Sequence, residues 1–218
     1  MPRLHPPHTC PGVAVLVELG KGQLLRRIHD TRFGPTEFNP TPRPPIVPVV
    51  GGRFDSLDGG YAYLYAADRE RGALAEAFAR NLAYTDSGPW PLPKRLFEGK
   101  AISWVKCRRS LRLVKVYADG AQQLGQDDWL TTCDEDGYPL CREWAEAIRR
   151  WVPDADGLSW RSKRDPDESV HMLWCNPLDR LGATLLERQF GPEAILGGRT
   201  EVRVQKFLSE WRLFISRP

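Results

Sequence analysis

The sequence lacks the features that mark several large classes of protein. No apolar run approaches the roughly 20 residues that a helix needs to cross a bilayer, so we expect no membrane-spanning helix. The opening residues, MPRLHPPHTCPG, have no apolar segment of the kind found in secretory signals and are expected to form a flexible, Pro-rich lead-in. Neither GxGxxG nor GxxxxGK followed by Ser or Thr occurs, so neither a Rossmann-type dinucleotide fold nor a P-loop is supported.

Metal-binding and disulfide patterns are also missing. The five cysteines are an odd number, and none belongs to a CxxC pair. We therefore expect reduced thiols in a cytoplasmic protein and no metal site. The formal net charge of +3 is too small to indicate a nucleic-acid partner by itself, although it suits a local arginine cluster for an anionic small molecule.

What is present indicates one domain of mixed helices and strands. The 218 residues are enough for a sizeable core, and the Pro-rich residues 35–52 are expected to form an extended loop. Asp68 is expected to cap a helix that runs to about Leu82. Strands and helices do not alternate regularly, which favours an α+β domain over a doubly wound sheet. The expected strands are residues 24–29, 61–66, 101–107, 111–118, 157–162 and 169–175, and a second helix is expected over residues 140–151. Near the end of the chain, residues 200–216 are expected to form one or two strands or a short helix.

Five polar side chains near the ends of these elements are candidates for a functional site. Taken singly they say little, because a lone arginine at a strand end or a glutamate on a helix usually faces solvent. Glu76 lies about 200° around its helix from Leu74, at 100° per residue, so geometry alone does not separate a cleft from solvent. The five candidates are Arg27, Arg53, Tyr65, Glu76 and Ser162.

The order of the elements resembles the RES-domain family, which is named for its Arg, Glu and Ser. The resemblance runs from Leu24 to Cys175 and is carried by RRIHDTRFGP, GGRFDSLDGGYAYLYAADRERGALAEAF, LRLVKVYADG, DGLSWRSKRDP and VHMLWC. It implies an ADP-ribosyltransferase-like fold, with a small β-core of two sheets and surrounding helices in a single domain. The chain then divides into a lead-in and first element (1–20), the RES domain (21–176) and a C-terminal extension packing on the same domain (177–218).

The family's site residues carry over by position. Arg27 matches the family Arg of the R-I-H stretch, Glu76 matches the Glu of A-L-A-E, and Ser162 matches the Ser that follows D-G-L. Tyr65 and Arg53 match further positions of the same pocket.

Three neighbours of these positions depart from the family pattern. Arg26 stands where an aromatic residue often precedes the family Arg, which leaves the choice between Arg26 and Arg27 open. Ser159 competes with Ser162 in the same way, and Asp55 stands where asparagine is frequent.

The resemblance implies a bacterial toxin that degrades NAD⁺ by cleaving the nicotinamide–ribose bond, with phosphate or water as the acceptor and without a metal. Nicotinamide leaves as a neutral ring, so the reaction needs stabilisation of positive charge on the ribose, a role that suits Glu76. Arg27, helped by Arg53, would bind the diphosphate or an incoming phosphate. Tyr65 would border the nicotinamide ring, and Ser162 would hydrogen-bond nicotinamide or phosphate.

The resemblance also implies a partner, an Xre-like antitoxin with a helix-turn-helix. A homodimer or a larger toxin–antitoxin assembly agrees with that setting, and neither a membrane nor a direct nucleic-acid contact is expected.

Three other interpretations stay open. The same pocket would serve an ADP-ribosyltransferase that modifies a protein or a nucleic acid, or an inactive toxin that only binds its partner. A non-catalytic nucleic-acid-binding module is the third, because REWAEAIRRW and WRSKR combine basic and aromatic residues. We favour an amphipathic helix with Trp144, Ile148 and Trp151 in the core over that interpretation.

Overall fold

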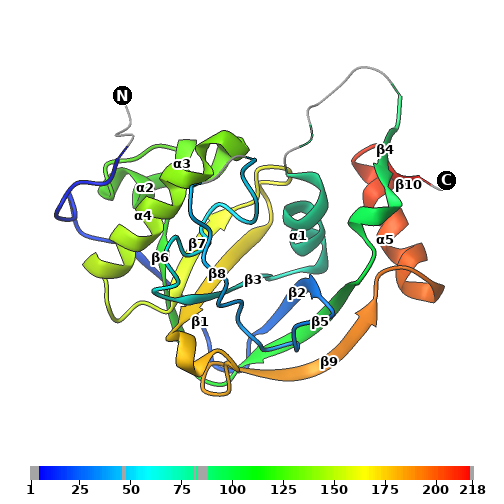
Figure 1. Ribbon diagram of the computed structural model, residues 1–218, viewed down its shortest axis with the longest axis horizontal. Helices are drawn as coiled ribbons and strands as arrows, with labels where there is room; N and C mark the ends of the chain where they lie inside the picture. The colour runs from blue at the N-terminus through cyan, green and yellow to red at the C-terminus, as the bar shows by residue number, and fades with distance from the viewer. Residues whose placement is uncertain (1–4, 46–47, 81, 83–87, 217–218) are drawn as a thin grey trace.

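A curled eight-stranded sheet forms the centre of the protein (Figure 1). The computed structural model describes residues 5–45, 48–80, 82 and 88–216. All neighbouring strands are antiparallel except β6 and β7, which are parallel. The strands, in their order across the sheet, are β1 (Leu16–Leu19), β6 (Leu111–Lys115), β7 (Gly157–Arg161), β8 (Ser169–Cys175), β3 (Ala62–Ala67), β2 (Leu24–Asp30), β5 (Lys100–Cys107) and β9 (Leu186–Ala194).

This sheet has a weak joint between β2 and β3. The two strands pair at a single position, Arg26 opposite Ala67, whereas β2 and β5 pair at seven positions from Leu24 to Asp30. The strands β1-β6-β7-β8-β3 form one half of the sheet and β2-β5-β9 the other, and this joint connects the two halves into one eight-stranded sheet. A separate two-stranded parallel sheet contains β4 (Trp90–Pro93) and β10 (Leu213–Ser216). The result is a single domain of mixed helices and strands.

Three helices cover one face of the first half: α2 (Ala118–Gln123), α3 (Trp129–Thr132) and α4 (Tyr138–Trp151). On α4, Trp144 and Ile148 are fully buried in the core and Trp151 is half-buried, as the amphipathic pattern predicted. The Pro-rich lead-in follows this helix instead of standing free. His5 Nδ1 lies 2.8 Å from Glu143 Oε2, and Trp151 Nε1 donates to the carbonyl of His8 at 3.2 Å.

The helix after β3 differs from the expected one. It begins as α1 (Glu70–Leu74) and continues as a π-helical turn, η1 (Ala75–Ala79). The expected N-cap at Asp68 was wrong, because Arg69 occupies the cap position and makes no side-chain capping bond. The carboxylate of Asp68 is engaged elsewhere, by Gln23 Nε2 at 2.8 Å and His171 Nε2 at 3.1 Å.

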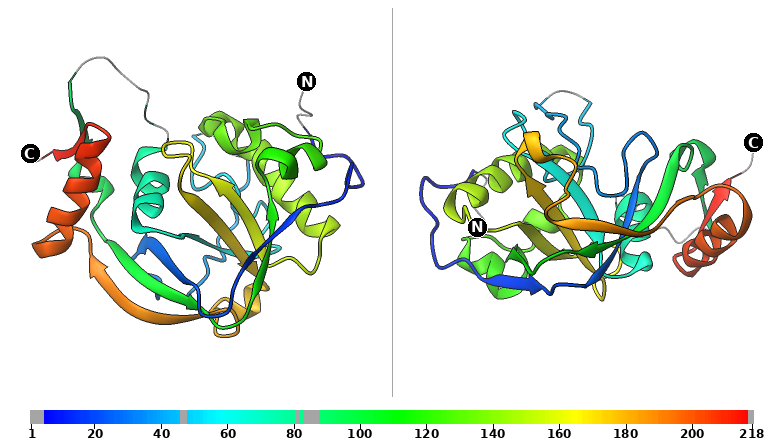
Figure 2. Two further views of the ribbon diagram at one scale, coloured as in Figure 1. Left: turned by 180° about the vertical axis from the view of Figure 1, so that it is seen from behind. Right: turned by 90° about the horizontal axis from the view of Figure 1, so that it is seen from below.

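The chain after Pro177 forms more structure than the sequence indicated. The long strand β9 leads to α5 (Gly198–Glu210), and β10 follows it; Figure 2 shows β5 and β9 curving together toward α5. Short 3-10 turns occupy Lys94–Leu96, Glu135–Gly137 and Pro177–Asp179. Among the described residues no helix has the length and apolarity needed to cross a membrane. The apolar cluster that joins α5 and β10 to α1 contains Leu74, Ala79, Leu92, Phe97, Ile195, Val204, Leu208 and Leu213.

Candidate functional site

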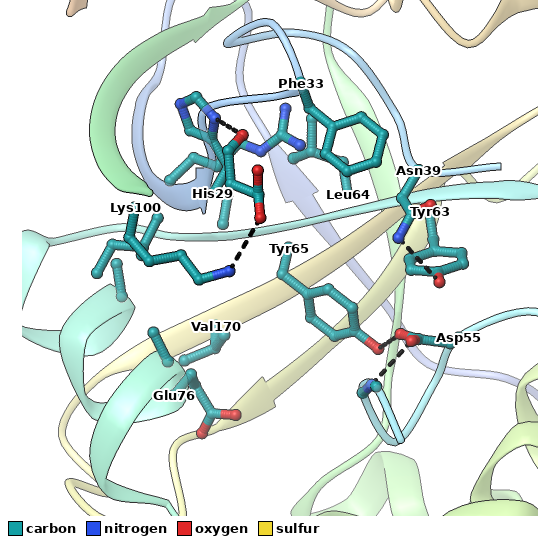
Figure 3. A pocket seen from close by; sticks show the side chains of 18 of the residues that line it. His29, Phe33, Asn39, Asp55, Tyr63, Leu64, Tyr65, Glu76, Lys100 and Val170 are labelled. Atoms are coloured by element: carbon teal, nitrogen blue, oxygen red, sulfur yellow. Dashed lines mark hydrogen bonds and ion pairs between the residues drawn. The ribbon is translucent and has the colours of Figure 1, made fainter. Parts of the chain in front are cut away.

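A cavity of about 510 Å³ opens where β2 and β3 separate. Its walls come from those two strands, from the helix α1 with its π-helical turn, and from the long loop that precedes β3. Because the strands pair only at Arg26 and Ala67, side chains from both faces of the sheet reach the space between them. Figure 3 shows Tyr65 in the middle of this view, between Glu76 on one side and Asn39 and Tyr63 on the other.

Three of the five candidate residues line this one cavity: Arg27, Tyr65 and Glu76. They come from β2, from β3 and from the π-helical turn, so segments about 50 residues apart in the chain converge here. The cavity thus joins a guanidinium, an aromatic ring and a carboxylate.

Arg27 is nearly fully buried, and its guanidinium is held in place. Nη1 donates to the carbonyls of Gly34 and Pro35 at 3.1 and 2.8 Å. Burial lowers the pKa of Arg27 to about 9, and the charge of Glu37 offsets part of that effect. The side chain is therefore a cation at neutral pH. Arg26 also lines the cavity, but its Nη1 is bound to the carbonyls of Leu24 and Asp68.

Glu76 presents a carboxylate that forms no hydrogen bond with any described residue. Both oxygens are buried and lack a hydrogen-bond partner among the described residues, and Nη1 of Arg80 is 3.9 Å from Oε2. A buried polar group left without a partner costs about 1–3 kcal/mol, and more when it is charged. π-helical turns often occur at functional sites, and this one places Glu76 against the cavity. The arrangement suits a carboxylate that acquires its partner from a ligand.

Tyr65 is fixed by the loop that precedes β3. Its hydroxyl donates to Asp55 Oδ1 at 2.8 Å and accepts from the backbone N–H of Phe54 at 3.0 Å. Asp55 Oδ2 also accepts from the N–H of Gly52 at 2.8 Å. Burial raises the pKa of Asp55, and burial together with Asp55 raises that of Tyr65, so the phenol stays neutral. Asp55, noted in the sequence only as a departure from the family, therefore orients the cavity's central ring.

Arg53 and Ser162 do not line the cavity. Arg53 is fully buried, and none of its three guanidinium nitrogens has a hydrogen bond to a described residue. Its Cζ lies 5.6 Å from the ring centroid of Tyr138, and Cζ of Arg80, which does line the cavity, lies 5.1 Å from the same centroid. Both guanidinium groups thus lie against the ring of Tyr138, and of the two only that of Arg80 lines the cavity.

The two serines lie in different surroundings. Ser162 is buried and its hydroxyl has no partner among the described residues, although its backbone N–H donates to the carbonyl of Glu168 at 3.0 Å. The hydroxyl of Ser159 is hydrogen-bonded to His171 Nδ1 at 3.1 Å. Neither serine lines the cavity, but only Ser162 keeps an unused hydroxyl.

Arg142 holds in place the loop wall, which is the part of the cavity wall formed by the long loop before β3. This residue was not singled out from the sequence. This buried side chain, on α4, donates from Nε to the carbonyl of Gly52 at 3.1 Å, from Nη1 to that of Arg43 at 3.0 Å and from Nη2 to that of Val50 at 2.6 Å. Three carbonyls of one Pro-rich loop are thereby tied to one helix. The sequence feature that could have identified it is its spacing on α4, because it lies one turn after Tyr138 on the buried face.

Charged and neutral side chains surround the end of the cavity near β5. Lys100 Nζ is 3.5 Å from Asp30 Oδ2, and hydrogen bonds from Arg32 lower the pKa of Asp30. Burial and the nearby charge of Arg27 lower the pKa of His29, which is therefore neutral at pH 7. Figure 3 shows His29 and Lys100 on this side of the cavity. In the part of the chain that the structure describes, no group of three His, Cys, Asp or Glu side chains is placed to hold a metal ion.

Comparison with known proteins identifies the family. The model of the RES domain matches residues 24–186, a span that includes β2, β3, the π-helical turn and all five candidate residues. No curated protein shows a significant match to the chain. The RES domain is associated with toxins that act on NAD⁺ and with an antitoxin partner. Since the match covers well over half of the 218 residues, the chain belongs to the RES-domain family.

Proposed function

We propose that this protein is a toxin that degrades NAD⁺ by breaking the bond between nicotinamide and ribose. The observation that carries the proposal is the shared cavity, in which Arg27 and Glu76 meet across a space of about 510 Å³. Ligand pockets typically measure about 300–1,000 Å³, and this cavity falls within that range. Family membership supplies the connection to NAD⁺.

Glu76 is proposed as the group that stabilises the transition state. As the bond to nicotinamide breaks, the ring becomes neutral and positive charge develops on the ribose. A carboxylate beside the ribose attracts that charge and accepts a hydrogen bond from a ribose hydroxyl. The two free oxygens of Glu76 support both roles, because no described residue donates a hydrogen bond to either.

Arg27 and Tyr65 are proposed to position the substrate. Nη1 of Arg27 is already bound to two carbonyls, so its remaining donors are oriented in advance for phosphate oxygens. Tyr65 presents an aromatic ring held by Asp55, and such a face suits the cationic nicotinamide. Catalysis then depends mainly on orientation and electrostatics, without a covalent step on the protein.

Arg53 and Ser162 are proposed to bind the acceptor, the molecule that attacks the ribose. Both are buried, and both keep donors that no described residue uses. An unpaired buried guanidinium is unfavourable, and an incoming phosphate would supply its counter-charge. Because neither residue lines the cavity, this role requires a rearrangement of the neighbouring side chains. Phosphate is therefore the proposed acceptor, with water as the alternative.

We also propose an ADP-ribosyltransferase-like fold, with the cavity at the joint between the two sheet halves. We further propose a cytoplasmic protein neutralised by an Xre-like antitoxin, alone or in a larger assembly.

The test is an assay of purified protein with NAD⁺, with and without inorganic phosphate. We expect nicotinamide release in both conditions, faster with phosphate, with ADP-ribose carrying a phosphate at the anomeric carbon as the product. Release with ADP-ribose alone would assign water as the acceptor. Label from NAD⁺ found on a macromolecule would assign an ADP-ribosyltransferase. Absence of nicotinamide release from folded protein would overturn the proposal.

A further inference from the structure

Two cysteines outside the cavity lie in direct contact. Cys133 follows α3, Cys141 lies in the first turns of α4, and their Sγ atoms are 3.2 Å apart. Cys141 is fully buried and Cys133 is 8% exposed. The sequence separates them by only seven residues, with the 3-10 turn Glu135–Gly137 between them. The two sulfurs are thus held within reach of one another.

The surroundings make the two sulfurs chemically different. A hydrogen bond from the thiol of Cys141 lowers the pKa of Cys133 against the opposing effect of burial, and the charges of Arg53 and Lys163 add to the lowering. The same contact, together with burial, raises the pKa of Cys141. A thiolate is the reactive form of cysteine. Cys133, which is also the more exposed of the two, is therefore the sulfur that ionises more readily, and Cys141 is a thiol beside it.

We propose that Cys133 and Cys141 form an oxidation site that closes to an intrachain disulfide on reaction with a peroxide. The thiolate of Cys133 attacks one oxygen of hydrogen peroxide, giving a sulfenic acid and releasing hydroxide. The sulfur of Cys141 then attacks the Cys133 sulfur, and the sulfenic hydroxyl leaves with the Cys141 proton as water. With the hydroxide protonated, two thiols and one peroxide become one disulfide and two waters.

This site is connected to the cavity through α4. Cys141 lies between Tyr138, which contacts Arg53 and Arg80, and Arg142, which holds three carbonyls of the loop wall. Disulfide formation brings the sulfurs from 3.2 Å to about 2.05 Å. It also removes a negative charge whose interaction with Arg53 favours the thiolate. Both changes act on the first turns of α4, so oxidation is expected to lower turnover in the cavity.

The first experiment tests the disulfide without any assay of activity. The full chain is treated with hydrogen peroxide, its remaining thiols are alkylated, and its peptides are mapped by mass spectrometry. After cleavage at the acidic residues Asp134–Asp136, which lie between the two cysteines, we expect a peptide pair linked through Cys133 and Cys141 that disappears on treatment with dithiothreitol. Cys175→Ser is the matched control and should give the same link. Two alkylated thiols after peroxide, or Cys133 as a sulfinic acid with Cys141 free, would overturn the proposal.

The second experiment tests the connection to the cavity and rests on the proposed function. Nicotinamide release is measured before oxidation, after oxidation and after reduction. We expect a several-fold loss after oxidation and recovery after reduction, in the wild type and in Cys175→Ser but not in Cys133→Ser. Equal rates for the reduced and disulfide forms would remove the connection. If no NAD⁺ is consumed in any form, the proposed function fails while the peptide map still decides whether the disulfide forms.

Discussion

Among the single residues of the site, Glu76 is the one whose buried, unpaired carboxylate indicates a ligand-binding role. Its two oxygens are buried and have no hydrogen bond to a described residue, and the nearest cation described for it, Arg80, is 3.9 Å away. A purely structural carboxylate would normally be satisfied by donors of the protein itself. The environment therefore favours a role that is completed when substrate enters.

Replacing Glu76 by glutamine removes the charge and keeps the shape. We expect a loss of about 2–4 kcal/mol of transition-state stabilisation, which corresponds to a fall in kcat of roughly 30- to 900-fold. Steady-state rates of nicotinamide release measure it. Glu98→Gln, at an exposed position, is the matched control and should leave kcat unchanged. A Glu76→Gln enzyme with the wild-type rate would remove Glu76 from the reaction.

Arg27 gives a prediction about pH. Burial lowers its pKa to about 9, so the guanidinium is charged below that pH and loses its proton as pH rises through it. The KM for NAD⁺ should therefore be constant from pH 7 to about 8 and increase above about 9. Initial rates over this range measure the effect. Arg27→Met should show a high KM at every pH and no such increase; a flat profile in the wild type would contradict the prediction.

The sequence identified some residues around the cavity and missed another. The order of motifs singled out Arg27, Tyr65 and Glu76, which the structure brings to one cavity. Arg142 was missed because an arginine on a helix normally faces water, and its three carbonyl partners belong to a loop about 90 residues earlier. The sequence pattern of α4 alone cannot predict hydrogen bonds to such a distant segment.

At the scale of elements, the placement of Glu76 depends on how closely α1 approaches the sheet. Gly72 permits that approach: a Cβ there would lie 3.0 Å from the Cβ of Glu168 and 3.2 Å from that of Ala67. Alanine favours a helix over glycine by about 0.8–1.0 kcal/mol, whereas overpacking costs about 1–3 kcal/mol. The two effects oppose each other, and the contacts decide the sign.

We expect Gly72→Ala to destabilise the fold by up to about 2 kcal/mol, the difference between these two effects, and to lower kcat by moving the π-helical turn. Chemical denaturation and nicotinamide release measure the two parts. Gly20→Ala is the control, because a Cβ at Gly20 would meet nothing within 4 Å. A variant as stable as the wild type would show that α1 can move without cost.

Elements with clear alternation were predictable and irregular ones were not. The strands expected at residues 24–29, 101–107 and 169–175 are present as β2, β5 and β8, within one residue at each end. Two strands were missed because their sequences contain residues that usually end strands. These are β4, with the sequence WPLP, and β9, which contains Gly191 and Pro192.

At the scale of the whole molecule, the question is whether the C-terminal segment is part of the RES domain or an addition to it. The family match ends at residue 186, yet α5 and β10 share an apolar cluster with α1. That cluster includes Leu74 and Ala79, which flank Glu76 in the chain, so the extension supports the helix that carries the carboxylate. We therefore predict that residues 177–218 unfold together with the rest.

Leu208→Ala tests whether α5 unfolds cooperatively with the rest of the domain. Leu208 is fully buried in the shared cluster, and removing a buried leucine side chain typically costs about 2–5 kcal/mol. If α5 belongs to the same cooperative unit, the midpoint of denaturant unfolding should fall in a single transition, followed by tryptophan fluorescence and by circular dichroism. Val202→Ala, at a position 72% exposed on the same helix, should leave the midpoint unchanged. Two separate transitions, or a loss of α5 alone with the remaining midpoint preserved, would instead show that the segment after β9 is an independent addition, and Glu76 would then have to be held by the sheet.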